Sequence, residues 1–513
     1  MKKIEKIKQV REKYKRCMFF GGFLLVLIAI GGCGNAVEAG TTIPSEEKEQ
    51  IREMEEENLQ AATQEEPQEE TQEEPGEEAQ REPWPEAPIL TCTVWEDNRF
   101  DEDGTLLAEG TLSYFEMSAR GYESAAAAVE AFFRSQEDDF EKNMDLLEEY
   151  GQDTYITSQE EDWLEFYPYY SRQDWEITRA DAGIISFCGR FSEYFGGAHD
   201  QRWTSGVTFD AKTGKELRFL DLAKDQEKFL EETLNVCLEA AEEKREDYNF
   251  FPDYEEVIRS RWQEEPEWYL DGSGITVLFS PYEIAPFASG TVRLHLPYQE
   301  FGEYLLPEYA MGASEGMALL PENEEVRIEM GYDRLVSSYL LQRTDGRSFL
   351  LFDGDMASED YVTYIYEVTD GKRVKTWESD VTTRIRQGSV TPQGSLELGL
   401  RLDVLGTHMT YGHFQITEEG TVEEEGAWYS LERETILTTV RELPVLVAGE
   451  EKTLSAGSRL LITGTDRKGI MGYIDTASGE EGEIHYTLSE EGRPVYIEGV
   501  EETQYFEDLP YAG

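Results

Sequence analysis

The spacing of apolar residues changes along the chain, and it predicts two folded regions of different kinds. Between residues 88 and 308, alternating stretches typical of strands are interspersed with stretches whose apolar residues recur at helical spacing. From residue 320 onward, short alternating stretches are separated by Gly and Asp turns at close intervals. We therefore predict an α+β fold, in which a mixed strand and helix region precedes a β-rich C-terminal region built as a meander or as small barrels.

Three helices are predicted in the first region, over residues 123–149, 225–245 and 253–264. The core face of the first helix is formed by apolar residues at helical spacing: Val129, Phe132, Phe133, Phe140, Met144 and Leu147. Gly151 is expected to end this helix, because glycine is favoured at helix C-termini.

Strands are expected between and after these helices, because apolar and polar side chains alternate there. In the first region they cover residues 109–118, 174–180, 184–194, 202–210, 216–219, 275–279 and 292–296. In the second region they include residues 336–342, 348–353, 361–368, 395–403, 410–416, 458–463, 469–475 and 482–487. The turn pattern divides the second region into a β-rich domain at 320–440 and a small barrel at 441–513.

The chain begins with a pattern typical of a secretory signal. A basic stretch precedes an apolar run of about fifteen residues, whereas a membrane-spanning helix needs about 20. The run ends in Ile30-Gly31-Gly32-Cys33, which resembles the bacterial lipobox. This resemblance implies that residues 1–32 are removed and that Cys33 carries a lipid at the extracellular face of a Gram-positive-type cytoplasmic membrane. An uncleaved signal anchor is the alternative interpretation.

Composition adds a tether and a strongly acidic character. Residues 33–87 are predicted to be an acidic disordered tether, because residues 45–87 hold seventeen acidic and three basic residues and almost no apolar ones. Over all 513 residues the net charge is −62. Nucleic acid is therefore excluded as a partner, since phosphate backbones require a basic surface, whereas a basic protein would be attracted. Solubility alone is the simpler explanation of this charge.

The residues that usually carry catalysis or metal binding form no recognisable motif. The sequence contains no GxSxG, HExxH, P-loop or suitably placed GxGxxG pattern. His408 and His413 are the closest histidine pair, and a regular strand would place them on opposite faces. We therefore expect no metal, no cofactor and no enzymatic activity. Three cysteines follow the tether, Cys92, Cys188 and Cys237, and the sequence does not determine whether any two of them pair.

Two short motifs stand out as candidate binding or structural elements. The first, Tyr194-Phe-Gly196-Gly197-Ala-His199-Asp, joins two predicted strands, and its adjacent glycines permit a tight turn that His199 would brace. A surface recognition loop is the alternative interpretation of this motif.

The second motif, Pro281-Tyr282-Glu283-Ile284-Ala-Pro286-Phe287, is a loop stiffened by two prolines. Tyr282, Glu283 and Phe287 are either held out for binding at low entropic cost or packed against the core. The sequence favours neither interpretation.

Residues 88–305 resemble the RsiV-like extracellular domain family, a pair of linked modules. The resemblance rests on Tyr194, Gly196-Gly197-Ala198-His199, Phe209-Asp210, Thr213-Gly214-Lys215 and the run from Pro281 to Gly290, in this order. It implies an α+β fold with a module boundary near residue 195. Family members occur as lysozyme-binding sensor domains of anti-sigma factors, as accessory domains of peptidoglycan deacetylases and as lipoproteins of unknown role.

Together these features predict a lipid-anchored extracellular binding protein of the cell envelope. Its expected ligand is a cell-wall component such as peptidoglycan or a basic protein such as lysozyme, and its contact with the membrane is the lipid anchor. Two alternatives remain: a cell-wall-modifying hydrolase with an unidentified active site, and a structural envelope lipoprotein. The sequence does not determine the oligomeric state.

Overall fold

The computed structural model describes residues 83–160, 164–321, 334–356, 360–369, 372–379, 381–489, 492–506 and 508–511. The predicted signal segment, Cys33 and nearly all of the predicted tether lie outside these residues. The described residues fall within one unit, defined by its internal contacts, that runs from Gln80 to Gly513. Among them, no helix has both the length and the apolar composition that crossing a membrane requires.

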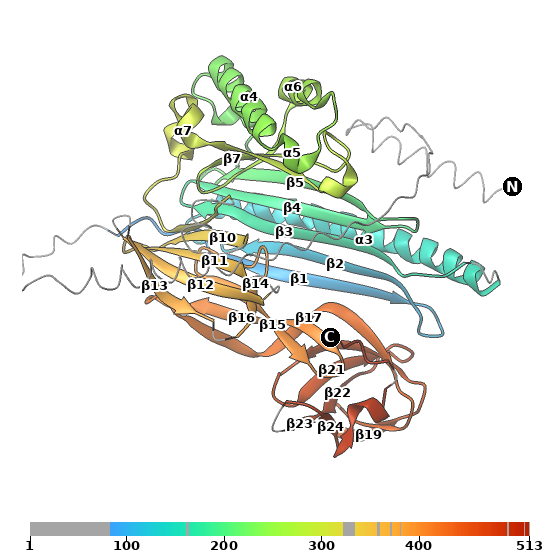
Figure 1. The fold of residues 1–513 in the computed structure, drawn as a ribbon. Helices are drawn as coiled ribbons and strands as arrows, with labels where there is room; N and C mark the ends of the chain where they lie inside the picture. The colour runs from blue at the N-terminus through green and yellow to red at the C-terminus, as the bar shows by residue number, and fades with distance from the viewer. Residues whose placement is uncertain are drawn as a thin grey trace, which may run out of the picture. The chain divides into compact units, whose positions relative to one another are not determined.

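A ten-stranded sheet organises the first region and continues into the second (Figure 1). Its strands are β1 (Leu90–Phe100), β2 (Leu106–Met117), β3 (Tyr169–Asp181), β4 (Ile184–Tyr194), β5 (Gln201–Asp210), β9 (Gly316–Leu319), β10 (Arg334–Gln342), β11 (Ser348–Met356), β12 (Asp360–Thr369) and β13 (Lys372–Glu378). β3 is the branch point of the sheet. One edge pairs with β2 in parallel near its start and with β9 antiparallel near its end, and the other edge pairs with β4 antiparallel.

The sheet crosses the boundary that the sequence suggested between residues 308 and 320. β3 comes from the first predicted region and β10 to β13 come from the second, and β9 hydrogen-bonds to both β3 and β10. β4 and β5, on the two sides of the module boundary predicted near residue 195, are also hydrogen-bonded neighbours. Backbone hydrogen bonds therefore run without interruption across both positions.

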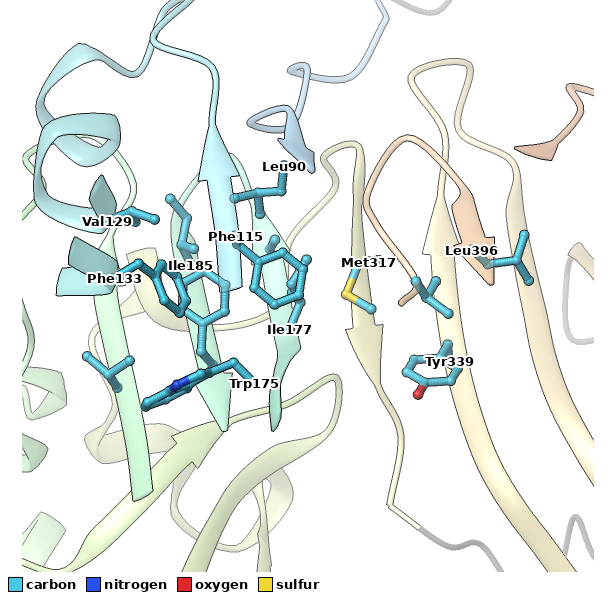
Figure 2. Packing of buried hydrophobic residues seen from close by; sticks show 14 of the residues in the cluster. Leu90, Phe115, Val129, Phe133, Trp175, Ile177, Ile185, Met317, Tyr339 and Leu396 are labelled. Atoms are coloured by element: carbon cyan, nitrogen blue, oxygen red, sulfur yellow. The ribbon is translucent and has the colours of Figure 1, made fainter. Parts of the chain in front are cut away.

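The helix α3 (Glu123–Glu160) covers one face of this sheet with the apolar positions that the sequence predicted. Val129, Phe133, Phe140, Met144 and Leu147 are all at most 2 % exposed. Figure 2 shows Val129 and Phe133 beside Phe115 and Trp175, and places Met317, Tyr339 and Leu396 further along the same buried cluster. One hydrophobic core thus extends from the helix through the sheet to strands of the C-terminal region.

The predicted helix end at Gly151 is wrong, since α3 continues to Glu160. Gly151 lies where the helix passes against β2: a Cβ atom at this position would stand 2.7 Å from the carbonyl oxygen of Leu107. The glycine therefore allows the helix and the strand to approach closely, and it does not act as a helix stop.

A second, smaller layer of the first region combines a three-stranded sheet with helices. Its elements are η2 (Phe219–Leu222), α4 (Gln226–Glu243), α5 (Arg245–Tyr248), α6 (Tyr254–Glu264), β6 (Glu267–Leu270), β7 (Gly274–Phe279), η3 (Phe287–Ser289), β8 (Val292–Pro297), α7 (Tyr298–Phe301), η4 (Gly302–Tyr304) and η5 (Pro307–Tyr309). The expected strand at 216–219 is reduced to a single bridge between Phe209 and Glu216, and the chain enters η2 instead. Phe219 is buried there among Phe229, Trp262 and Trp268, and this packing outweighs its strand propensity.

The C-terminal region is β-rich, and none of its described sheets closes into a barrel. A nine-stranded sheet contains β14 (Thr383–Ile385), β15 (Ser395–Asp403), β16 (Thr407–Ile416), β17 (Val422–Thr438), β18 (Leu443–Val447), β19 (Glu450–Leu454), β20 (Arg459–Thr465), β21 (Ile470–Asp475) and β22 (Glu481–His485). A three-stranded sheet contains β23 (Thr487–Leu488), β24 (Val495–Ile497) and β25 (Val500–Glu501), followed by η6 (Glu502–Gln504). Within the nine-stranded sheet, β14 to β17 and β20 to β22 follow the predicted meander, whereas β17 pairs with β20 and β22 with β18.

Candidate functional site

The two motifs that the sequence singled out come together at the surface. The loop between β4 and β5 carries His199, and the loop between β7 and β8 carries Tyr282 and Phe287. The His199 ring stacks on the Phe287 ring with centroids 4.3 Å apart and an interplanar angle of 26°. Tyr282 lies 5.6 Å from Phe287 and 6.4 Å from His199, again between ring centroids. We call His199, Tyr282 and Phe287 the aromatic loop cluster.

The first loop takes its shape from its two glycines. Gly196 and Gly197 have φ angles of 85° and 110°, which L side chains rarely adopt. The Tyr194 hydroxyl donates a hydrogen bond to the carbonyl oxygen of Gly197 at 3.1 Å. His199 Nδ1 lies 2.6 Å from the carbonyl oxygen of Asp200, and the Nδ1–H tautomer donates to it. These contacts orient the exposed His199 ring toward the second loop.

A buried carboxylate beside this loop fixes a cation against the cluster. Asp200 is 5 % exposed and accepts hydrogen bonds from Ser192 Oγ at 2.6 Å, Arg202 Nε at 2.7 Å and the Tyr170 hydroxyl at 3.1 Å. Burial opposes ionisation of Asp200, but these three donors outweigh it and hold its pKa below the usual value. Arg202 is thereby held with its guanidinium 5.5 Å from the Phe287 ring centroid, in cation–π contact.

The second loop divides its side chains between the core and the surface. Ile284 is 0 % exposed, whereas Tyr282 is 49 % exposed and Phe287 is half-buried. Glu283 accepts from Arg261 Nε at 2.5 Å and from the backbone N–H of Ser280 at 3.0 Å. Both interpretations of this loop, packing against the core and exposure for binding, therefore hold for some of its residues. Ile284 packs into the core, Glu283 forms hydrogen bonds within the protein, and Tyr282 faces solvent.

Tyr282 adopts a strained backbone conformation. Its φ angle is 70°, in the left-handed region where a bulky residue other than glycine is uncommon. Its N–H donates to the carbonyl oxygen of Ala285 at 3.0 Å, which closes the turn. Strain of this kind persists where the surrounding structure imposes it, and it is concentrated at functional loops.

Further aromatic residues, outside the predicted motifs, gather near Tyr194. Tyr170 stacks on Tyr194 with centroids 5.7 Å apart, and Phe166 lies 6.4 Å from Tyr169. Tyr167, next to them, is 54 % exposed. The sequence signal was present in the run Phe166-Tyr-Pro-Tyr-Tyr170, but only the pairing of β3 with β4 brings it beside Tyr194.

The described residues offer no alternative site based on a metal or a thiol. They contain no group of three or more His, Cys, Asp or Glu side chains positioned to hold a metal ion. His408 is buried and His413 is exposed beside Glu397, so the two lie on opposite faces of β16 as predicted. Cys92, Cys188 and Cys237 are all free, and burial raises the pKa of the Cys92 and Cys188 thiols to about 12.

Comparison with known proteins identifies a domain without an assigned function. Residues 220–299, which include the second loop, match the family model described as "Protein of unknown function (DUF3298)". A comparison with curated proteins returned no match. The finer RsiV-like assignment stays a prediction.

Two solved structures of this family are similar to the chain. A DUF3298 family member from Bacteroides fragilis NCTC 9343 is 17% identical, with a TM-score of 0.33. The alignment covers 44% of this chain and 96% of the Bacteroides chain. A DUF3298 family protein from Pseudomonas aeruginosa PAO1 is 13% identical, with a TM-score of 0.30. That alignment covers 44% of this chain and 97% of the Pseudomonas chain. Both are described as members of the family that the sequence match names, and no activity is stated for either.

Proposed function

We propose that this chain is an extracellular binding protein that recognises a basic protein such as lysozyme through the aromatic loop cluster. The observation that carries the proposal is the joining of His199, Tyr282 and Phe287 from two separate loops into one surface group. Tyrosine and arginine dominate the energetics of protein–protein interfaces, and Arg202 stands beside this cluster. The RsiV-like resemblance, which includes lysozyme-binding members, favours the same partner.

Rigidity and charge both support binding at this surface. The second loop is fixed by Pro281, Pro286, the buried Ile284 and the bonds of Glu283, so Tyr282 loses little conformational entropy when a partner docks. The net charge of −62 attracts a cationic protein and accelerates its encounter with the chain. The predicted tether contributes only a minor part of this charge, so the folded region is itself acidic.

The predicted anchor and tether complete the proposal. A lipid on Cys33 would hold the chain at the outer face of the membrane, and the acidic segment up to residue 82 would space the folded part away from it. Mass spectrometry of the mature protein tests this part directly. A lipidated N-terminal Cys33 is expected, and an intact Met1 would overturn the anchor.

Binding is tested with the full chain in detergent and purified lysozyme at physiological salt. A Kd of about 10 µM or tighter is expected, and Tyr282→Ala should weaken binding by about tenfold or more, as for a central interface tyrosine. Val374→Ala is the matched control, because Val374 is 62 % exposed on β13, outside the cluster. No binding at about 100 µM lysozyme would overturn the proposal. Co-sedimentation with purified peptidoglycan, lost in Tyr282→Ala, would instead assign the cluster to the wall polymer.

A further inference from the structure

A second chemical constellation lies in the small sheet, at the end of the β7–β8 pair opposite to the loop that carries Tyr282 and Phe287. The turn between β6 and β7 is Asp271-Gly272-Ser273, Gly274 begins β7, and β8 places His295 against this turn. Ser273 Oγ lies 3.2 Å from His295 Nε2. On the other side of the ring, His295 Nδ1 lies 3.2 Å from Asp271 Oδ2. A hydroxyl, an imidazole and a carboxylate therefore follow one another within hydrogen-bonding reach.

From this geometry we infer that Ser273, His295 and Asp271 form a reactive serine site that attacks activated acyl or phosphonyl groups. Such constellations are recognised by the roles and spacing of the side chains and recur on unrelated folds in different chain orders. Separations near 3.2 Å are within the range expected before a substrate binds. The sequence motif GxSxG is not required for this chemistry.

Asp271 is the most buried of the three side chains, and His295 and Ser273 are more exposed, as the proposed chemistry requires. The Asp271 side chain is 2 % exposed, the His295 side chain is 19 % exposed, and Ser273 is half-buried. The carboxylate is thus shielded from water while the imidazole and the hydroxyl remain partly accessible. Asp271 acts through His295, so it is a positioning residue, whereas Ser273 and His295 are the catalytic residues.

The neighbours of the imidazole select the tautomer that can accept a proton. Nδ1 faces both Asp271 Oδ2 and Thr276 Oγ1, which lies 3.2 Å away and itself donates to Asp271 Oδ2 at 2.8 Å. A proton on Nδ1 is therefore stabilised by the carboxylate, and Nε2 is left free to accept from Ser273.

Glycine makes the approach of the two strands possible. A Cβ atom on Gly274 would lie 2.0 Å from the carbonyl oxygen of Leu296 and 2.8 Å from His295 Cε1. A larger residue at 274 would push β7 away from β8 and separate Ser273 from the ring.

In the proposed step, Ser273 Oγ forms a bond to the carbonyl carbon of an ester while its proton passes to His295 Nε2. The carbon–oxygen bond to the alcohol breaks, and the alkoxide takes that proton from Nε2. Water then attacks the acyl-serine by the same route, releasing the acid and restoring the hydroxyl. A fluorophosphonate reacts analogously, with Ser273 Oγ bonding to phosphorus as fluoride leaves.

The hydrogen bonds of the turn also lower the rate of acylation that we expect at Ser273. The backbone N–H groups of Ser273 and Gly274 both donate to Asp271 Oδ1, at 2.9 Å in each case, so neither is free to stabilise an oxyanion. Ser273 Oγ additionally lies 3.3 Å from the same oxygen. Loss of one oxyanion donor slows acyl transfer by about 10² to 10³, and we therefore expect slow, stoichiometric acylation instead of fast turnover.

The test is covalent labelling of the full chain with a fluorophosphonate probe, followed by mapping of the modified peptide. One phosphonyl group per chain on Ser273 is expected, with none there in Ser273→Ala. His295→Gln should slow labelling by about 10² or more, the usual contribution of a general base. Ser289→Ala is the matched control, since its hydroxyl donates to the carbonyl oxygen of Tyr248 at 2.6 Å and should not react.

Two results would overturn the inference. The first is an unlabelled Ser273 peptide in the wild-type chain, which needs no variant to fold. The second is an unchanged labelling rate in a folded His295→Gln variant. Lysozyme binding is measured separately, so neither result depends on the proposed function.

Discussion

The helix-covered region and the β-rich region bury their cores by different means. In the first, α3 closes one face of the ten-stranded sheet with aromatic residues such as Phe133, whose ring packs against Trp175 at 5.8 Å and Phe187 at 5.3 Å between centroids. In the C-terminal region, the core of residues 402–506 is drawn from strands and their connections without an α-helix. Because α3 covers the face of the sheet, the loops at the strand ends are not needed to close the core. Two loops at strand ends carry the aromatic loop cluster of the first region.

A carboxylate is buried where the two large sheets meet. Asp353 on β11 is 0 % exposed and accepts from Thr363 Oγ1 on β12 at 2.7 Å. It also accepts from the backbone N–H of Ile385, on β14 of the nine-stranded sheet, at 2.8 Å. The Asp353 carboxylate therefore forms hydrogen bonds with residues of both large sheets. The contrast between the regions can be tested at Asp353 and in the two hydrophobic cores.

The largest expected effect comes from truncating each core in turn. Phe133→Ala should lower the free energy of unfolding by about 3–5 kcal/mol and Leu460→Ala by about 2–5 kcal/mol, because each leaves a cavity at a buried position. Leu460 belongs to the nine-stranded sheet, whose Leu396 and Ile416 pack in the same hydrophobic cluster as Phe133. Both variants should therefore shift one common transition, followed by tryptophan fluorescence and far-ultraviolet circular dichroism in denaturant. Two separate transitions, each moved by only one variant, would show that the regions unfold independently.

A smaller, pH-dependent effect is expected at the joint between the sheets. Burial raises the pKa of Asp353 to about 7, although the bonds from Thr363 and Ile385 oppose the shift. The folded state therefore binds the carboxyl proton of Asp353 more tightly than the unfolded state does. Protonation of Asp353 stabilises the fold at low pH, and this stabilisation is lost as the pH rises from about 4 to 7.

Asp353→Asn removes that loss. At pH 8 the variant should be more stable than the wild type by about 1–3 kcal/mol, whereas at pH 4 the two should be nearly equal. Urea unfolding at both pH values measures the difference. A variant that is less stable than the wild type at pH 8 would mean that the ionised carboxylate is the stabilising form.

The smallest expected effect lies in the aromatic loop cluster. Tyr282→Gly should leave the free energy of unfolding unchanged or raise it by about 0.5–1 kcal/mol, because glycine adopts a φ of 70° without strain. The same change should weaken lysozyme binding by about tenfold or more, as expected for Tyr282→Ala. Thermal unfolding monitored beside lysozyme binding separates the two readouts, and a clear destabilisation would assign Tyr282 to the fold instead of the surface.

Periodicity was sufficient for most elements of both regions. The strand predicted at 184–194 coincides with β4, and the helix predicted at 253–264 differs from α6 by one residue at its start. Both are local patterns, in which a strand shows a period of two and a helix a period of 3.6. Gly151 and residues 216–219 were mispredicted because contacts with Leu107 and with the Phe219 pocket, which are distant in sequence, decide them.

The candidate sites show the same division. Each loop of the aromatic loop cluster was recognised separately from its glycines or prolines, but their meeting at a 4.3 Å ring stack was not predictable. Arg202 was missed because its role depends on the buried Asp200 beside it. Ser273 and His295 gave no motif at all, since they become neighbours only through the pairing of β7 with β8.

The sequence by itself determined the α+β class, the positions of most strands and helices, the acidity, the glycine turn and the proline-stiffened loop. These properties depend on residue spacing and composition, which are local and additive. The tertiary structure alone decided that one sheet runs through both regions, that two loops form one surface, and that a serine faces a histidine. Such contacts depend on strand order and register, which are selected by packing of the whole core and are not encoded in any short segment.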